Sequence, residues 1–183
     1  MNLELYFLRS SEQKIVSDML YYAQRVDESD KSLQECSEIH IYDEFYGLTP
    51  KDLGVYAMVD AEVAGAIWSR RLSDYHNSKA FIDNDTPVLN IAVKPTFRSK
   101  GVATAMIEQF LQEAATLYDA LSISVPKRAE TISFFEKFGF EIVQNSQHKS
   151  YCDEKNSIVM IKKLQRKSKE YLGDEFTDCK WLD

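Results

Sequence analysis

An apolar strand, a short turn and a long amphipathic helix follow one another directly between residues 88 and 117. Residues 88–93 read Val-Leu-Asn-Ile-Ala-Val, which is typical of a buried strand, and Pro95 interrupts the run. From about residue 100 to residue 117, apolar side chains recur at helical spacing: Ala103, Met106, Ile107, Phe110, Ala114 and Leu117. A helix with one apolar face must pack against another element, so this segment predicts a layered fold of strands and helices.

The rest of the chain alternates between short strands and helices. We predict strands at residues 3–8, 55–59, 63–68, 121–125, 140–143 and 157–164. We predict helices after a cap at Ser10 or Ser11, within 26–51, and at 129–138, where Gly139 ends the helix. Residues 72–87 are expected to form a long loop. This order indicates an α/β (α+β) fold, in which a mixed central sheet carries helices on both faces.

The bulk properties of the chain limit its organisation and its partners. Its 183 residues fit one domain, which we place at residues 1–164, followed by a charged C-terminal tail at 165–183. The net charge of −7 argues against nucleic-acid binding, because a phosphate backbone requires clustered Lys and Arg. There is no apolar run that could cross a bilayer and no signal peptide, so we expect a cytoplasmic protein without a membrane partner. The three cysteines are widely spaced, so neither a metal site nor a disulfide framework is predicted, and a homodimer is left open.

The loop that joins the strand at 88–93 to its helix suits an anion. It reads Arg98-Ser99-Lys100-Gly101-Val102-Ala103-Thr104 and opens directly into the helix. The first turn of a helix has backbone N–H groups without intrahelical partners, and the helix dipole adds partial positive charge there. Gly101 permits close approach of a phosphate, and Ala103 keeps the next turn uncrowded. Arg98 and Lys100 add positive charge, so two linked phosphates would fit this loop.

This segment resembles the cofactor-binding motif of the GNAT superfamily of N-acetyltransferases. The motif, Arg/Gln-x-x-Gly-x-Gly/Ala, stands here as Arg98-Ser99-Lys100-Gly101-Val102-Ala103, within a longer matching string that begins at Leu89. A second block, at residues 131–140, is similar to the helix and Gly-Phe segment near the end of these domains. The resemblance covers residues 3–164 in element order. It implies a GNAT-like fold with a mixed, mostly antiparallel central sheet.

The resemblance also implies where acetyl-CoA, the cosubstrate of this superfamily, would bind. Its pyrophosphate would rest on backbone N–H groups at Ser99, Lys100, Gly101, Val102, Ala103 and Thr104, with Arg98 at the start of the loop. Its pantetheine arm would pair with the main chain at Ile91, Ala92 and Val93, in a slot that opens toward residues 121–125. The N–H of Val93 would then face the thioester carbonyl and stabilise the oxyanion.

Two positions depart from the superfamily pattern. Many members have an Asn after the next strand that contacts the cofactor, and Arg128 stands at the nearest position here. Many members also have a Tyr that protonates the departing thiolate, whereas the matching residue here is Phe135, which has no proton to give. Three explanations stay open: another group supplies the proton, the thiolate leaves unassisted, or the chain binds acetyl-CoA without rapid turnover.

Transfer to an amine requires a base or a water relay, because only the neutral amine attacks the thioester. Asp83 and Asp85 precede the strand at 88–93, and Asp85 is the better candidate because it lies nearer to that strand. The alternative for both is a solvated turn. Ser124 could hold a water at the slot, unless it is a satisfied hydroxyl of the core. The catalytic candidates are therefore Asp85, Ser124 and the position of Phe135.

The sequence thus predicts an acetyl-CoA-dependent N-acetyltransferase that acts on a small-molecule or peptide amine by direct attack in a ternary complex. An acyl-CoA-binding regulatory domain of weak or no activity, on the same fold, is the alternative. A P-loop protein is excluded, because Gly-x4-Gly-Lys-Ser/Thr does not occur in the chain. A dinucleotide-binding fold is excluded because the loop has only one glycine.

Overall fold

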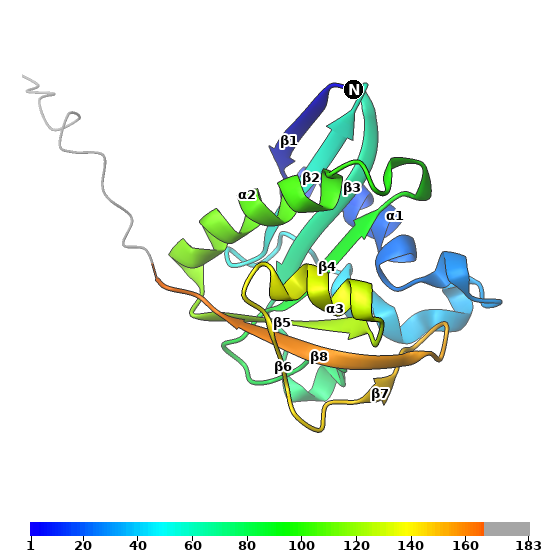
Figure 1. Ribbon diagram of the computed structural model, residues 1–183, viewed down its shortest axis with the longest axis vertical. Helices are drawn as coiled ribbons and strands as arrows, with labels where there is room; N and C mark the ends of the chain where they lie inside the picture. The colour runs from blue at the N-terminus through cyan, green and yellow to red at the C-terminus, as the bar shows by residue number, and fades with distance from the viewer. Residues whose placement is uncertain (167–183) are drawn as a thin grey trace, which may run out of the picture.

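An eight-stranded sheet carries the fold in the computed structural model, which describes residues 1–166 (Figure 1). The strand order is β1-β2-β3-β4-β5-β8-β6, and β7 also pairs with β8. The strands are β1 (Leu3–Phe7), β2 (Leu53–Val59), β3 (Glu62–Arg70), β4 (Val88–Val93), β5 (Ala120–Pro126), β6 (Glu141–Ile142), β7 (His148–Lys149) and β8 (Asn156–Lys163). The β4–β5 pair is parallel and the other pairs are antiparallel. The predicted mixed, mostly antiparallel sheet is therefore confirmed.

Helices cover both faces of this sheet. The α-helices are α1 (Gln13–Ala23), α2 (Val102–Leu117) and α3 (Ala129–Glu136). Short 3-10 segments are η1 (Ser10–Glu12), η2 (Val26–Glu28), η3 (Leu33–Tyr42), η4 (Asp74–His76) and η5 (Pro95–Phe97). Figure 1 shows α2 and α3 in front of the sheet, with α1 behind it. Each face has its own apolar core, so the sheet is the middle of three layers.

Side-chain alternation along the strands divides the core residues between these two layers. On β3, Ile67 packs into the core under α2 and α3, whereas Trp68 packs into the core under α1 and η3. The indole N–H of Trp68 donates to the carbonyl of Tyr42 at 2.9 Å, which anchors η3 to the sheet. The apolar face predicted for α2 is buried at Met106, Ile107, Phe110 and Ala114.

Three local predictions need correction. Ser10 and Ser11 do not cap α1; they form η1, and Glu12 stands at the N-cap of α1 without a side-chain cap hydrogen bond. The helical stretch expected within 26–51 consists of the 3-10 segments η2 and η3. Strand β7 was not predicted at all. From residue 167 onward, the tail expected at 165–183 lies outside the described residues.

The position of β4 beside β5 opens the sheet. Val88 and Ser122 form the single register pair between these two strands of the described sheet, and the Ser122 N–H donates to the Pro87 carbonyl at 3.0 Å. Beyond this pair the strands diverge toward Val93 and Pro126. Among residues 1–166, no helix is both long and apolar enough to span a membrane.

Candidate functional site

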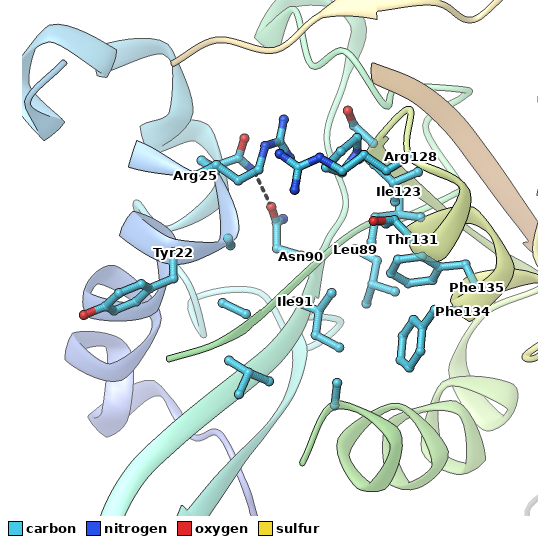
Figure 2. Close-up of a pocket in the computed structure, with 18 of the residues that line it drawn as sticks. Tyr22, Arg25, Leu89, Asn90, Ile91, Ile123, Arg128, Thr131, Phe134 and Phe135 are labelled. Atoms are coloured by element: carbon cyan, nitrogen blue, oxygen red, sulfur yellow. Dashed lines mark hydrogen bonds between the residues drawn. The ribbon is translucent and has the colours of Figure 1, made fainter. Parts of the chain in front are cut away.

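A cleft of about 280 Å³ fills the gap between the diverging strands. Its walls come from β4, β5, α3, and the segment where α1 ends and η2 begins. Figure 2 shows these elements around the cleft, with Phe134 and Phe135 on the α3 side and Arg25 and Tyr22 on the α1 side. The cleft thus lies between the two layers of helices, where a cosubstrate and an acceptor could approach from different faces.

Backbone groups of β4 face this cleft. The Lys94 N–H donates to Ala64 of β3 at 2.8 Å, and backbone groups alternate in direction along a strand, so those of Ile91 and Val93 point away from β3. The Val93 carbonyl accepts a hydrogen bond from the Arg98 guanidinium at 3.1 Å, which agrees with this direction. The structure therefore places Ile91, Ala92 and Val93 in the wall of the cleft. The main-chain groups of Ile91 and Val93 face the cleft.

The loop before α2 lines a second hollow, of about 300 Å³, at the mouth of the cleft. The two share Val93, Arg98, Ala103 and Phe134. Gly101 caps α2 with φ +80°, and no atom lies within 4 Å of the place where its Cβ would be. The first turn of α2 borders this hollow, and the N–H groups of a first helical turn suit a phosphate.

The structure brings together most of the residues predicted to hold the cofactor. The second hollow is lined by Arg98, Ser99, Gly101, Val102, Ala103 and Thr104, and Arg128 lines the cleft as the residue that precedes α3. Lys100 is the exception. It is exposed, and its ammonium donates to the Thr96 carbonyl at 2.9 Å, outside the residues that line either space.

A group of opposite charges bridges the mouth of the cleft. The Glu28 carboxylate lies 3.7 Å from Arg98, 3.2 Å from Arg128 and 3.9 Å from Lys155. Asp27 lies 3.4 Å from Arg98, and burial raises the pKa of its carboxyl group, although the Arg98 charge opposes this. Both acids stand on η2, so anion-binding arginines and carboxylates meet where the α1 layer approaches the α2 loop.

A buried polar group projects into the cleft from the middle of β4. Asn90 is 4% exposed, and its side-chain carbonyl accepts from Gln24 at 2.8 Å (dashed line in Figure 2). Its Nδ2 has no hydrogen-bond partner. Buried donors are normally satisfied, so this amide is suited to an oxygen of a bound molecule. Sequence reasoning missed Asn90 as a functional residue, although a polar residue inside an apolar strand was the signal.

Phe135, at the position of the usual acid, lies in the cleft wall within an aromatic cluster. It is 4% exposed, and its ring meets Phe134 and Phe140 edge-to-face at 5.2 and 5.4 Å. Residue 135 therefore lies where the usual acid would be, but its phenyl ring contributes packing and no proton. In the described chain, any proton for a leaving thiolate must come from elsewhere.

The other two catalytic candidates differ in position. Ser124 lines the cleft, and its Oγ lies 2.7 Å from Nε2 of His148. Asp85 is exposed outside the cleft and pairs with Arg71, while Asp83 accepts backbone N–H groups of Asp85 and Thr86 at 2.9 and 2.8 Å. The two aspartates thus form the solvated turn that was the alternative for them. The structure does not bring Asp85 to the cleft, because it precedes the paired end of β4 and the cleft opens at the other end.

The fold thus has a sheet that splays between β4 and β5, with the N-terminus of α2, capped by Gly101, at the mouth of the gap. The family model described as "Acetyltransferase (GNAT) domain" matches residues 51–142, half of the chain, and the protein belongs to this family. A search of curated proteins found no match.

Solved structures show the same fold at low sequence identity. An acetyltransferase of the GNAT family from Streptococcus pneumoniae is 14% identical, with a TM-score of 0.63 over 89% of this chain and 99% of that one. A putative acetyltransferase from Salmonella typhimurium, solved with its cofactor acetyl-CoA, is 13% identical, with a TM-score of 0.65 over 92% and 97%. The ribosomal-protein-S18-alanine N-acetyltransferase from Escherichia coli is 15% identical, with a TM-score of 0.60 over 92% and 98%.

Proposed function

We propose that the protein transfers the acetyl group of acetyl-CoA to a primary amine by direct attack within a ternary complex. The observation that carries this proposal is the cleft between β4 and β5, which joins the backbone N–H groups of Ile91 and Val93 to an open helix N-terminus at Gly101. A thioester with a pantetheine arm and a pyrophosphate has polar groups at both of these places.

In this binding mode the pyrophosphate lies on the N–H groups of residues 99–104, with Arg98 and Arg128 beside it. The pantetheine amides pair with Ile91 and Val93 as a neighbouring strand would. The Val93 N–H then faces the thioester carbonyl and stabilises the negative charge that develops on its oxygen during attack. Acetyl-CoA would compete with Glu28 for Arg98 and Arg128, which would release a carboxylate at the cleft mouth.

Direct attack is supported by the position of the cysteines. Within the described residues, neither Cys36 nor Cys152 lines the cleft, and burial raises the pKa of the Cys152 thiol, which keeps it protonated. The cleft instead offers the Glu28 carboxylate for a cationic amine, once acetyl-CoA has taken Arg128 from it, and the unpaired Nδ2 of Asn90 for an acceptor oxygen. The acceptor class that fits is an amine with a nearby carbonyl or carboxylate.

Thermal unfolding with and without 1 mM acetyl-CoA tests the cosubstrate. A ligand that binds only the native state at 100 times its Kd stabilises it by about 2.7 kcal/mol, so we expect a clear rise in Tm. An unchanged Tm, together with no heat of binding in calorimetry, would contradict the cosubstrate assignment.

Release of free CoA thiol tests the transfer. The acceptors to compare are glycine, spermidine, the amide of lysine and a hexapeptide with a free N-terminal alanine, each with acetyl-CoA. We expect release above the amine-free rate with at least one of them, and acetylated product by mass spectrometry. The missing hydroxyl at Phe135 favours the second candidate, a regulatory acyl-CoA-binding domain, and binding without release across the panel would support it.

A further inference from the structure

The Ser124 hydroxyl connects the cleft to a histidine that lies outside it. Ser124 Oγ is 2.7 Å from His148 Nε2, and His148 Nδ1 is 2.8 Å from the carbonyl oxygen of Ser146. A carbonyl oxygen can only accept, so Nδ1 carries the proton in the neutral ring. Nε2 is then left to accept the proton of the Ser124 hydroxyl. The backbone at Ser146 thus fixes the tautomer in which His148 acts as a base toward Ser124.

His148 also borders a separate hollow of about 310 Å³, beside the exposed Gln144 and Gln147. Ser124 lines the cleft and His148 lines this outer hollow, so the pair joins the two spaces. A proton that reached the imidazole would therefore have a route to solvent that does not pass back through the cleft.

Few charged groups surround the imidazole. Lys79 shares the outer hollow, and Lys149 follows His148 in β7. On β8, Ser157 stands opposite His148 and receives a hydrogen bond from Arg25, which is itself paired with Asp153. Within the described residues, the ring nitrogens of His148 are hydrogen-bonded to Ser124 and Ser146 and to no carboxylate.

We propose that Ser124 is a catalytic residue of the acetyl transfer, and that His148 is the residue that receives, through Ser124, the proton released by the acceptor ammonium. This inference rests on the proposed N-acetyltransferase function and names a base for it. It also assigns a role to His148, which no local sequence pattern marks as a functional residue.

The proton and electron balance of the reaction is complete with this pair. The ammonium gives one proton to Ser124 Oγ as the Ser124 hydroxyl gives its own proton to His148 Nε2. The neutral amine then attacks the thioester carbon, forming the C–N bond and an oxyanion opposite Val93. Collapse breaks the C–S bond, and the second proton, on the attacking nitrogen, goes to the departing thiolate. The His148 imidazolium returns its proton to solvent through the outer hollow.

Transfer of the nitrogen proton to sulfur agrees with the lack of a hydroxyl at Phe135. A serine beside a histidine also acts as a nucleophile in other enzymes, where a carboxylate supports the imidazolium. Here the supporting group is the neutral Ser146 carbonyl, which favours a relay over formation of an acetylated serine.

The first test observes the histidine directly and needs no acceptor. The chain has three histidines, so nitrogen-15 NMR of histidine-labelled protein is assignable with His148→Gln. We expect His148 to hold its proton on Nδ1, and Ser124→Ala to shift the Nε2 resonance. A ring that is protonated on Nε2 instead would overturn the relay.

The second test is kinetic and uses the best amine of the acceptor panel. We expect Ser124→Ala and His148→Gln each to lower kcat by about 100-fold with the KM for acetyl-CoA nearly unchanged, because general-base catalysis contributes at least that much. The double variant should be no slower than either single variant. Imidazole added to His148→Ala should restore part of kcat, and the acid limb of the kcat/KM profile should be lost in His148→Gln.

His76→Gln is the matched control. His76 accepts from Ser73 at 3.0 Å in a serine–histidine pair away from the cleft, and this variant should keep the parent kcat. Full activity in folded Ser124→Ala and His148→Gln variants overturns the relay alone, as does acetylated Ser124 found after mixing with acetyl-CoA. A parent protein that neither binds acetyl-CoA nor acetylates an amine overturns the proposed function instead, whatever the histidine spectrum shows.

Discussion

At the scale of single residues, Gly101 links a backbone requirement to the cosubstrate. It adopts φ +80° at the start of α2, and a side chain there would project into the open hollow. We predict that Gly101→Val lowers the affinity for acetyl-CoA at least tenfold and destabilises the fold by about 1–2 kcal/mol, because a branched residue is strained in the left-handed region. Calorimetric titration and urea unfolding measure the two effects.

Gly139 provides the control for this variant. It also has φ +80°, and a Cβ there would meet only the Lys162 ammonium at 2.8 Å, a flexible end that can move. Gly139→Val should therefore be destabilised by a similar amount while it binds acetyl-CoA like the parent. Equal loss of affinity in both variants would mean that strain, and not the phosphate position, explains the effect of Gly101→Val.

Phe135 carries the second prediction at this scale. Because the residue lines the cleft, Phe135→Tyr adds a hydroxyl close to where the thiolate leaves. We expect kcat to rise by up to about tenfold with the Kd for acetyl-CoA unchanged, since an acid acts mainly in the transition state. Steady-state rates of the two proteins with one amine give the comparison.

Phe138→Tyr is the corresponding control. The Phe138 ring centroid lies 5.2 Å from that of Phe134, but Phe138 does not line the cleft. It should leave kcat unchanged. If Phe135→Tyr turns over at the parent rate while its Tm is unaltered, protonation of the thiolate does not limit the reaction and the prediction fails. A lower rate with a lower Tm would instead assign Phe135 a packing role, because a buried hydroxyl without a partner costs about 1–3 kcal/mol.

At the scale of elements, the open edge of β4 has a measurable signature. The backbone N–H groups of Ile91 and Val93 face the cleft, whereas those of Asn90 and Ala92 point toward β3. We predict faster hydrogen exchange at Ile91 and Val93 than at their two neighbours, and selective protection of the first pair by acetyl-CoA. Amide-resolved NMR exchange distinguishes this outcome from uniform protection of the strand, which would speak against pairing of pantetheine with β4.

Elements with a strong local pattern were predictable from the sequence. Strand β4 has the predicted bounds, and α2 begins two residues later than expected because Gly101 forms its cap. The prediction of a hairpin at β2 and β3 was also correct, and Asp60 and Ala61 adopt positive φ in its turn. Strand β7 has only two residues and depends on pairing with β8, so no periodicity could reveal it.

The candidate site was predictable to the same extent. The loop at 98–104 and the wall at 91–93 are continuous in sequence, and both lie at the cleft. The partner of Ser124 is 24 residues away in the chain, and Asp27 and Glu28 reach Arg98 from another layer of the fold. Such contacts arise from tertiary packing, which a single sequence does not display. Asp85 is close to β4 in sequence, but it lies at the paired end of the strand and outside the cleft.

At the scale of the whole molecule, one buried ion pair ties distant parts of the chain together. Arg25, after α1, donates to Asp153, before β8, at 2.8 Å, and the Asp153 side chain is 1% exposed. Burial alone would raise the pKa of Asp153, but hydrogen bonds from Arg25 and Ser150 outweigh it and hold the pKa below its usual value. Removing one partner of such a pair costs about 3 kcal/mol.

We therefore predict that Asp153→Asn lowers the free energy of unfolding at pH 7 by about 3 kcal/mol. A folded-state pKa below the unfolded value of about 3.9 contributes stability that is complete above that value and is lost as the pH falls through the folded pKa. The parent should lose more stability than the variant between pH 5 and pH 3 in urea unfolding. Asp85→Asn, in an exposed pair, should cost less than about 0.5 kcal/mol. Parallel pH curves for parent and Asp153→Asn would refute the role of this carboxylate.

The divergence of β4 from β5 also has a mechanical consequence. A force that pulled β1 away from β8 would be resisted by continuous strand pairing on both sides of the gap. Strand β4 pairs with β3 along Val88–Val93, and β5 pairs with β8 along Ala120–Pro126. Between β4 and β5 the force would meet one register pair, Val88–Ser122, and the covalent connection through α2. The sheet would therefore separate first between β4 and β5. The strands on each side of this boundary would remain paired with their other neighbours. A pantetheine arm that is hydrogen-bonded along β4 and held by the loop before α2 would raise the force needed to separate β4 from β5.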